Sequence, residues 1–275
     1  MEAQKHVILV DIDNTLYDWP KFFAPSFRAM CYALTRVLDV SQDELFRDFK
    51  SVYAHHDTLE YAFSIQELSV VKDMDRAEID ELIRIGRGAF SKVKKHHLQP
   101  YPGVIEGLEH ICKHGHIAIC VTNSPLYLAQ KRLYELGLDQ FISGIVAWEG
   151  IDPPEDINTD FVTRAKRKKT RIEKIETFKK SQSKPNRKPY EIALGMVKDE
   201  EIGAFWAIGD SLNKDLLPAS KLGIRTIWAK YGAEFDPESK DSQTLLKITN
   251  WSDAEVAHTF DVNSFEPDYR VENFS

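Results

Sequence analysis

The chain contains no long apolar run. Its 275 residues are 43% hydrophobic, but none of its apolar stretches approaches the roughly 18 residues that a membrane-spanning helix needs. No apolar stretch of signal-peptide length precedes Asp11, so nothing indicates export. We therefore expect no membrane segment and a cytoplasmic location.

Cysteine is also scarce. Cys31, Cys112 and Cys120 are an odd number, lack the paired spacing of a metal site and stand among aliphatic or aromatic neighbours, which is typical of reduced core residues. The formal net charge of −7 gives no overall reason to expect a nucleic acid or an acidic membrane as partner.

Short apolar runs rich in β-branched residues are present instead. Four of them are too short for helices, namely His6–Val10, Ile117–Val121, Phe205–Ile208 and Ile224–Ala229. Runs of this length and composition favour parallel strands that are covered by helices on both faces. Helical patterns lie between them, one at Val104–His114 and one that begins at Ser124 as N-cap with Pro125 in the first turn. The alternation predicts an α/β fold with a doubly wound parallel sheet and a Rossmann-like core.

Residues 19–98 interrupt this alternation. Helical periodicity is found at Phe22–Leu38, after a capping box at Ser41–Glu44, around Tyr61–Val71 and at Ala77–Val93. We expect an all-helical cap at residues 19–98, inserted into a core made of residues 1–18 and 99–275. A further helix is expected around Ser252–His258.

Charge is distributed unevenly along the chain. Residues 161–190 hold 12 lysines and arginines against 2 glutamates. We interpret residues 149–188 as a basic insertion within the core, and a solvated segment is favoured over an arm that binds nucleic acid or a segment that docks a partner. Only Phe161 and Phe178 stand among the cations, which weakens any hypothesis of base stacking.

Acidic and polar residues follow three of the predicted strands. They are Asp11 and Asp13 after the first, Thr122, Asn123 and Ser124 after the second, and Asp210, Ser211 and Asp215 after the third. Ligands of open parallel sheets bind outside the carboxyl ends of the strands, so these side chains are expected to meet. Crowded carboxylates repel one another unless a cation neutralises them. Because the ligands are all oxygen, the expected cation is Mg²⁺.

The pair Asp11 and Asp13 suggests a reaction. A carboxylate held against Mg²⁺ can attack phosphorus and give an aspartyl-phosphate that water later cleaves. The two residues are one strand repeat apart, so their side chains point the same way if the extended backbone continues. One would attack and the other would move the proton.

These motifs resemble those of the haloacid dehalogenase-like hydrolases. The motifs are Asp11-Ile-Asp-Asn-Thr15, Val121-Thr-Asn-Ser124 and Gly209-Asp-Ser-Leu-Asn-Lys-Asp215, with Pro100-Tyr-Pro-Gly103 at the return from the cap. The resemblance runs from Val7 to about Tyr231, and the basic stretch is its main departure.

The resemblance implies a role for each residue. Asp11 would be the nucleophile and a metal ligand, and Asp13 the acid and base, bound to the metal through its backbone carbonyl. Thr122 and Asn123 would hold the phosphoryl group. Asp210 would bind Mg²⁺, and Asp215 would bind the metal or support a ligand. An aspartate at position 13 is typical of the phosphatase branch of the family.

The family pattern also includes a lysine beside the nucleophile. Lys188 precedes Pro189 and a predicted helix at Tyr190–Val197, whereas Lys184 precedes Pro185 and stands 26 residues before Asp210. We favour Lys188 and keep Lys184 as the alternative.

The sequence thus predicts a Mg²⁺-dependent phosphatase for a small phosphorylated metabolite. Phosphoglycolate-like acids and nucleoside monophosphates both suit a helical cap, and the chain would be a monomer or a homodimer. Two alternatives remain, a phosphatase of nucleic-acid ends that uses the basic stretch, and a non-catalytic binding protein on the same fold.

Overall fold

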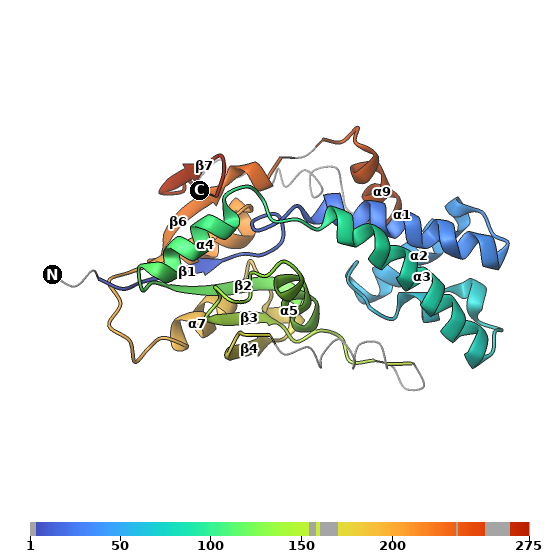
Figure 1. Cartoon of the computed structure of the whole chain (residues 1–275), viewed down its shortest axis with the longest axis horizontal. Coiled ribbons are helices and arrows are strands. Elements are labelled where there is room, and N and C mark those ends of the chain that lie inside the picture. The colour runs from blue at the N-terminus through green and yellow to red at the C-terminus, as the bar shows by residue number, and fades with distance from the viewer. Residues whose placement is uncertain (1–3, 154–157, 160–169, 235, 251–264, 275) are drawn as a thin grey trace.

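A parallel sheet organises the protein (Figure 1). The computed structural model describes residues 4–153, 158–159, 170–234, 236–250 and 265–274. The strands are β1 (His6–Val10), β2 (Ile117–Pro125), β3 (Gly144–Trp148), β4 (Lys174–Phe178), β5 (Ala204–Gly209), β6 (Arg225–Ala229) and β7 (Tyr269–Val271). Their order is β4-β3-β2-β1-β5-β6-β7, and every neighbouring pair is parallel. The predicted α/β fold is confirmed.

Strand β1 lies in the middle of this sheet. Val7 pairs with Ile117 of β2 on one side and with Phe205 of β5 on the other. The carboxyl ends of β2 and β5 therefore flank the point where β1 ends and Asp11 begins, as the strand pattern predicts.

Helices cover both faces of the sheet. They are α4 (Val104–Lys113), α5 (Leu126–Glu135), α7 (Lys188–Gly195) and α8 (Leu217–Ser220). Val10 belongs to the apolar cluster that includes Leu108 of α4 and Leu133 of α5. Leu9 belongs to the cluster that includes Ala193 of α7. Neighbouring residues of a strand face opposite sides, so a continuous apolar run is needed to bury both.

The sheet has three strands beyond the four predicted ones. Strand β3 is buried throughout, and its sequence has the same short apolar pattern as the four predicted strands. Strand β4 has four exposed residues and lies at the sheet edge, where polar side chains are tolerated. Strand β7 is only three residues long.

Strand β4 falls inside the basic stretch, so the described part of that stretch is not a purely solvated insertion. Several of its cations make contacts within the chain. Lys174 donates to the carbonyl oxygen of Met196 at 3.2 Å, and Lys180 pairs with Asp57 at 3.1 Å. Residues 160–169, which hold five of the basic side chains, lie outside the described residues.

Three long helices gather beyond the end of the sheet (Figure 1). They are α1 (Trp19–Leu38), α2 (Gln42–His56) and α3 (Arg76–His97), and the capping box of Ser41 and Glu44 at the start of α2 is present. The helix predicted around Tyr61–Val71 is wrong. Two 3₁₀ turns, η1 (Ser64–Glu67) and η2 (Ser69–Val71), take its place. The Asp48 carboxylate accepts hydrogen bonds from the Ser69 hydroxyl and the Val70 amide, which stabilise this local turn instead of a helix.

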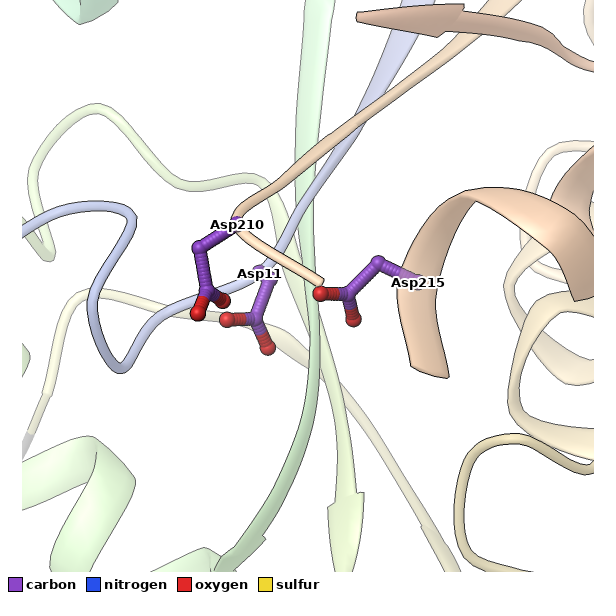
Figure 2. A group of neighbouring side chains, drawn as sticks. All are labelled: Asp11, Asp210 and Asp215. Atoms are coloured by element: carbon purple, nitrogen blue, oxygen red, sulfur yellow. The ribbon is translucent and has the colours of Figure 1, made fainter. Parts of the chain in front are cut away.

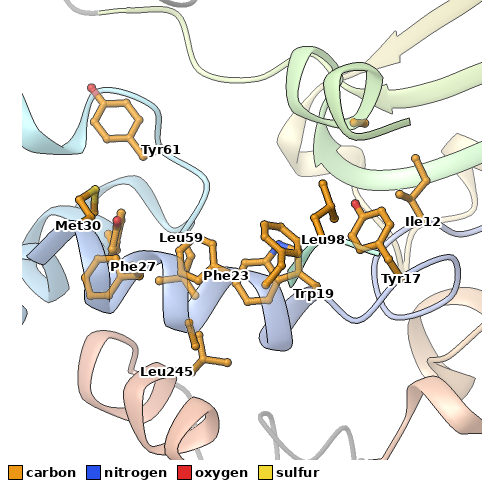
Figure 3. Packing of buried hydrophobic residues seen from close by; sticks show 14 of the residues in the cluster. Ile12, Tyr17, Trp19, Phe23, Phe27, Met30, Leu59, Tyr61, Leu98 and Leu245 are labelled. Carbon is orange, nitrogen blue, oxygen red and sulfur yellow. The ribbon is translucent and has the colours of Figure 1, made fainter. Parts of the chain in front are cut away.

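A short helix from the far end of the chain packs on the cap. Helix α9 (Lys240–Ile248) lies beside α1 and contributes Leu245 to the same apolar cluster (Figure 3). Arg28 of α1 pairs with Asp241 at 2.8 Å. The division of the chain into a cap of residues 19–98 and a core stays a prediction. Helix α9 lies outside that range in the sequence but packs on the cap. The helix expected at 252–258 lies outside the described residues. Among the residues that the structure describes, no helix is both long and apolar enough to cross a membrane.

Phe27 anchors the packing of α1 on α2. Its side chain is fully buried, and its ring lies 5.4 Å from that of Phe46 and 5.1 Å from that of Phe49. We expect Phe27→Ala to lower the free energy of unfolding by about 3–5 kcal/mol, because transfer and cavity costs add. Urea unfolding measures this. Tyr32→Ala on the same helix, where the side chain is 62% exposed, should change stability by less than about 0.5 kcal/mol. Equal losses would contradict the assignment of Phe27 to the core.

Candidate active site

Three aspartates meet at the carboxyl edge of the central strands (Figure 2). Asp11 directly follows β1, Asp210 directly follows β5, and Asp215 lies in the π-helical turn Leu212–Leu216. All three are buried, and each offers an oxygen within 4.8 Å of the others. Residues that are about 200 positions apart thus form one acidic cluster.

Short local contacts hold the cluster in place. The Asp11 amide donates to the carbonyl oxygen of Ile208 at 2.9 Å, which ties the end of β1 to β5. The Thr15 hydroxyl accepts from the Asp210 amide at 3.1 Å and donates to the Asp11 carboxylate at 3.4 Å. Gly209 leaves room for Asp215, since a β-carbon there would come within 2.6 Å of that carboxylate.

Lys184 is the cation of this cluster. Its Nζ donates to Asp11 Oδ1 and to Asp215 Oδ1, each at 2.5 Å, and to the carbonyl oxygen of Val121 at 2.9 Å. The side chain of Lys188 is 46% exposed, and within the described part of the chain its ion-pair partner is Glu191, at 3.9 Å. The preference for Lys188 is therefore corrected, because helix α7 begins at Lys188 and carries its side chain to the surface.

Asn123 fixes the position of Lys184. Its amide oxygen accepts from the backbone N–H of Lys184 at 2.8 Å, and its amide nitrogen donates to the Lys184 carbonyl at 2.9 Å. Asn123 was expected to hold the phosphoryl group, and both ends of its amide are engaged with Lys184 instead. Thr122 is buried, and its hydroxyl accepts from the Ser124 amide at 3.1 Å.

Burial dominates the electrostatics of the cluster. It raises the pKa of Asp11 to about 7, and the ammonium of Lys184 offsets only part of that effect. Burial also raises the pKa of Asp210 well above its usual value, and the negative charges of Asp215 and Asp11 add to the rise. For Lys184, burial acts to lower the pKa, but the two carboxylates outweigh it and raise the pKa well above the usual lysine value.

The donor set fits a hard divalent cation. Three carboxylates share one ammonium, so the cluster keeps an excess of negative charge in a buried place. Its ligand atoms are all oxygen, as Mg²⁺ prefers. Asp215 is already bonded through both oxygens, to Lys184 and to the Ser211 amide. The second oxygen of Asp11 has a longer contact, 3.4 Å to the Thr15 hydroxyl, so Asp11 and Asp210 are the stronger candidates for direct ligands, and Asp215 for the residue that supports them.

Asp13 stands apart from the three clustered carboxylates. The backbone turns after Asp11, since the Ile12 carbonyl accepts from the amides of Thr15 and Leu16. The Tyr17 hydroxyl donates to Asp13 Oδ1 at 2.6 Å, and Arg132 of α5 donates to the same oxygen at 2.7 Å. The Ser124 hydroxyl donates to the other oxygen.

Ser124 therefore does not cap helix α5 as predicted. Strand β2 continues through it to Pro125, and the helix starts at Leu126 without a side-chain cap. The Ser124 hydroxyl, which the sequence suggested as a helix cap, donates a hydrogen bond to Asp13 instead.

A cavity of about 510 Å³ opens between the core and the cap beside these residues. Asp13, Asn123 and Lys184 line it from the core, and Trp19 and Glu60 line it from the cap side. Its size is within the range of small-molecule sites.

Sequence comparison identifies the family. The family model of the haloacid dehalogenase-like hydrolases matches residues 5–223, and the chain belongs to this family. The resemblance predicted from the motifs is confirmed.

Two curated relatives are glyceraldehyde 3-phosphate phosphatases. That of Methanopyrus kandleri is 22% identical over 244 residues, which cover 86% of this chain and 89% of that protein. That of Pyrococcus furiosus is 23% identical over 247 residues, which cover 86% and 85%.

Solved structures of the family share the fold. A HAD phosphatase from Thermococcus onnurineus aligns with a TM-score of 0.52 at 18% identity, over 98% of this chain and 94% of that one. The HAD-hydrolase YfnB from Bacillus subtilis, which is bound to magnesium, aligns with a TM-score of 0.50 at 16% identity, over 99% and 96%.

Two residues of the site were missed from the sequence. Glu60 lies in a cap loop that has no periodic pattern to mark it. Arg132 stands one turn after Leu128 and Ala129 on the buried face of α5, and a charged residue at such a position is the signal that could have found it.

Proposed function

We propose that the protein is a Mg²⁺-dependent phosphatase that hydrolyses a small phosphomonoester. The observation that carries this proposal is the contact of Lys184 with Asp11 inside the acidic cluster, beside a cavity of suitable size. A buried carboxylate next to a cation that itself lines a ligand cavity is suited to attack an electrophile.

The reaction proceeds in two displacements. A carboxylate oxygen of Asp11 forms a bond to phosphorus while the bond from phosphorus to the leaving oxygen breaks, and Asp13 gives its proton to that oxygen. Asp13 then takes a proton from water as the water oxygen bonds to phosphorus. The bond between phosphorus and Asp11 breaks, and inorganic phosphate leaves. Lys184 neutralises the phosphoryl oxygens in both steps, Thr122 orients the group, and Asn123 keeps Lys184 in place.

Asp11 and Asp210 would hold the Mg²⁺, with the backbone carbonyl of Asp13 as a further ligand and Asp215 as support. When bound, the ion supplies positive charge to the phosphoryl oxygens.

The substrate is proposed to be a small phosphorylated metabolite. Both curated relatives act on a three-carbon phosphate by their names, which favours small phosphorylated acids or aldehydes over nucleoside monophosphates. The described cations of the basic stretch are used in part within the chain, which lowers the support for nucleic-acid ends as substrate. The cytoplasmic location and the oligomeric state stay predictions.

Metal removal tests this proposal. Phosphate release from p-nitrophenyl phosphate and from a panel of small phosphomonoesters is measured with Mg²⁺, with EDTA, and with Mg²⁺ in excess of EDTA. We expect activity in the first and third conditions and its loss in the second, because the acidic cluster then lacks its counter-charge. Equal activity in all three conditions would contradict the metal assignment. No release from any compound in Mg²⁺ would contradict the proposed function.

A further inference from the structure

A buried arginine connects the cap to Asp13. Arg132 of α5 is only 5% exposed. One of its terminal nitrogens, Nη1, donates to Asp13 Oδ1 at 2.7 Å, to the Tyr17 hydroxyl at 3.1 Å and to the Ser124 hydroxyl at 3.3 Å. The other, Nη2, pairs with Glu60 of the cap.

Glu60 is held as firmly as Arg132. Its side chain is 10% exposed. The indole N–H of Trp19 donates to its Oε1 at 3.1 Å, and the Ser124 hydroxyl lies 2.8 Å from its Oε2. Ser124 thus contacts the carboxylates of both Asp13 and Glu60, and Arg132 bridges the same two groups.

Charge explains why this arrangement is specific. One guanidinium is placed between two carboxylates whose side chains are 24% and 10% exposed, and its planar fork can serve both at once. Without Arg132, the two carboxylates would lose the cation between them, and their repulsion would favour a shift of Asp13. Without the negative charge of Glu60, Arg132 would keep Asp13 but would lose its ion pair with the cap.

The contacts of Asp13 leave its carboxylate little freedom. Tyr17 and Arg132 hold Oδ1, and Ser124 holds Oδ2. The carboxylate also borders the cavity in which the leaving group would lie. Its orientation is therefore determined by three core side chains, and through Arg132 by one cap side chain.

Resting on the proposed function, we propose that Arg132 is a positioning residue that aims Asp13 at the leaving oxygen. Because Glu60 belongs to the cap and pairs with Arg132, this positioning depends on the place of the cap over the cavity. Proton transfer from Asp13 is then efficient only when the cap loop that carries Glu60 lies over the cavity.

Leaving-group dependence provides the test. The nitrophenolate of p-nitrophenyl phosphate leaves without a proton, whereas phenyl phosphate needs proton donation far more. Misplacing a catalytic group by about 1 Å can cost on the order of 100-fold. We therefore expect Arg132→Met to lower kcat about 100-fold for phenyl phosphate and less than about 10-fold for p-nitrophenyl phosphate. Glu60→Gln, which keeps the size of its side chain, should show the same selectivity with a smaller loss.

Another ion pair between cap and core supplies the matched control. Lys94 of α3 and Glu135 of α5 lie 2.6 Å apart with 12% and 27% of their side chains exposed, and neither contacts Asp13. Any loss in Lys94→Met should be equal for the two substrates. Thermal melting of all variants separates unfolding from misplacement, and Glu60→Gln carries the test if Arg132→Met does not fold.

Two results would overturn the inference. One is an equal loss on both substrates in Arg132→Met, or in Glu60→Gln where the former does not fold. The other is a selective loss in Lys94→Met. The unmutated chain distinguishes these from a failure of the proposed function, because a chain that hydrolyses neither compound overturns both proposals together.

Discussion

Replacing Asp11 with asparagine should abolish phosphate release, with kcat falling on the order of 10⁵-fold. The amide has nearly the same shape as the carboxylate but lacks the nucleophilic oxygen. Folding should survive the change, because Lys184 keeps Asp215 as a partner at 2.5 Å. Steady-state kinetics with Mg²⁺ and a thermal melt of the same sample measure both expectations.

Asp57, a carboxylate on the cavity wall, serves as the control for Asp11. Its side chain is 91% exposed and, among the residues that the structure describes, pairs with Lys180. Asp57→Asn removes one carboxylate charge, as Asp11→Asn does, and the backbone of Asp57 lies in a left-handed conformation that asparagine tolerates. Its activity should be close to that of the unmutated chain. Retention of full activity by Asp11→Asn would exclude Asp11 as the nucleophile.

Lys184→Met should lower kcat by about 10³-fold, whereas Lys188→Met should leave it unchanged. Methionine fills the space of the lysine stem but cannot neutralise Asp11 or the phosphoryl oxygens, and a lost charge-stabilising donor in an active site costs about that much. Lys188 has its side chain 46% exposed and lies away from Asp11, so its removal should matter little.

The two lysine variants are compared by phosphate release at saturating substrate, with melting temperature measured alongside. Lys184→Met should also melt at a lower temperature, since Asp11 and Asp215 lose a buried counter-charge. The opposite order of activities would restore the prediction made from the sequence, in which Lys188 served the site.

The strands that position the site could be predicted from sequence because each is a short, continuous apolar run. His6–Val10 was predicted with the bounds that the structure has, and the acidic residues followed from where the runs end. The choice between Lys184 and Lys188 could not be made in the same way. Each precedes a proline, and only the contact between Lys184 and Asn123, 61 residues away in the chain, decides which one turns inward.

The helices of the cap could be predicted from the sequence, but the cap residues that line the cavity could not. Periodicity identifies α1, α2 and α3, whereas the residues after α2 adopt a loop and two 3₁₀ turns. Glu60 lies in that loop, where no repeat indicates burial. Its pairing with Arg132 spans 72 residues and depends on the packing of cap against core. Long-range contacts of this kind are not encoded in local propensity.

The central place of β1 has a consequence for the order of folding. Strand β1 is synthesised before both of its partners, β2, which begins at Ile117, and β5, which begins at Ala204. At translation rates of about 5–20 residues per second, the partner on the β5 side emerges on the order of 10 seconds or more after β1. During that interval the β5 side of β1 has no strand with which to form hydrogen bonds, and Asp11 has no Asp210 beside it. Helices α1, α2 and α3 are synthesised in the meantime and can pack on one another before β5 emerges, so the cap side of the cavity can form before the acidic cluster is complete.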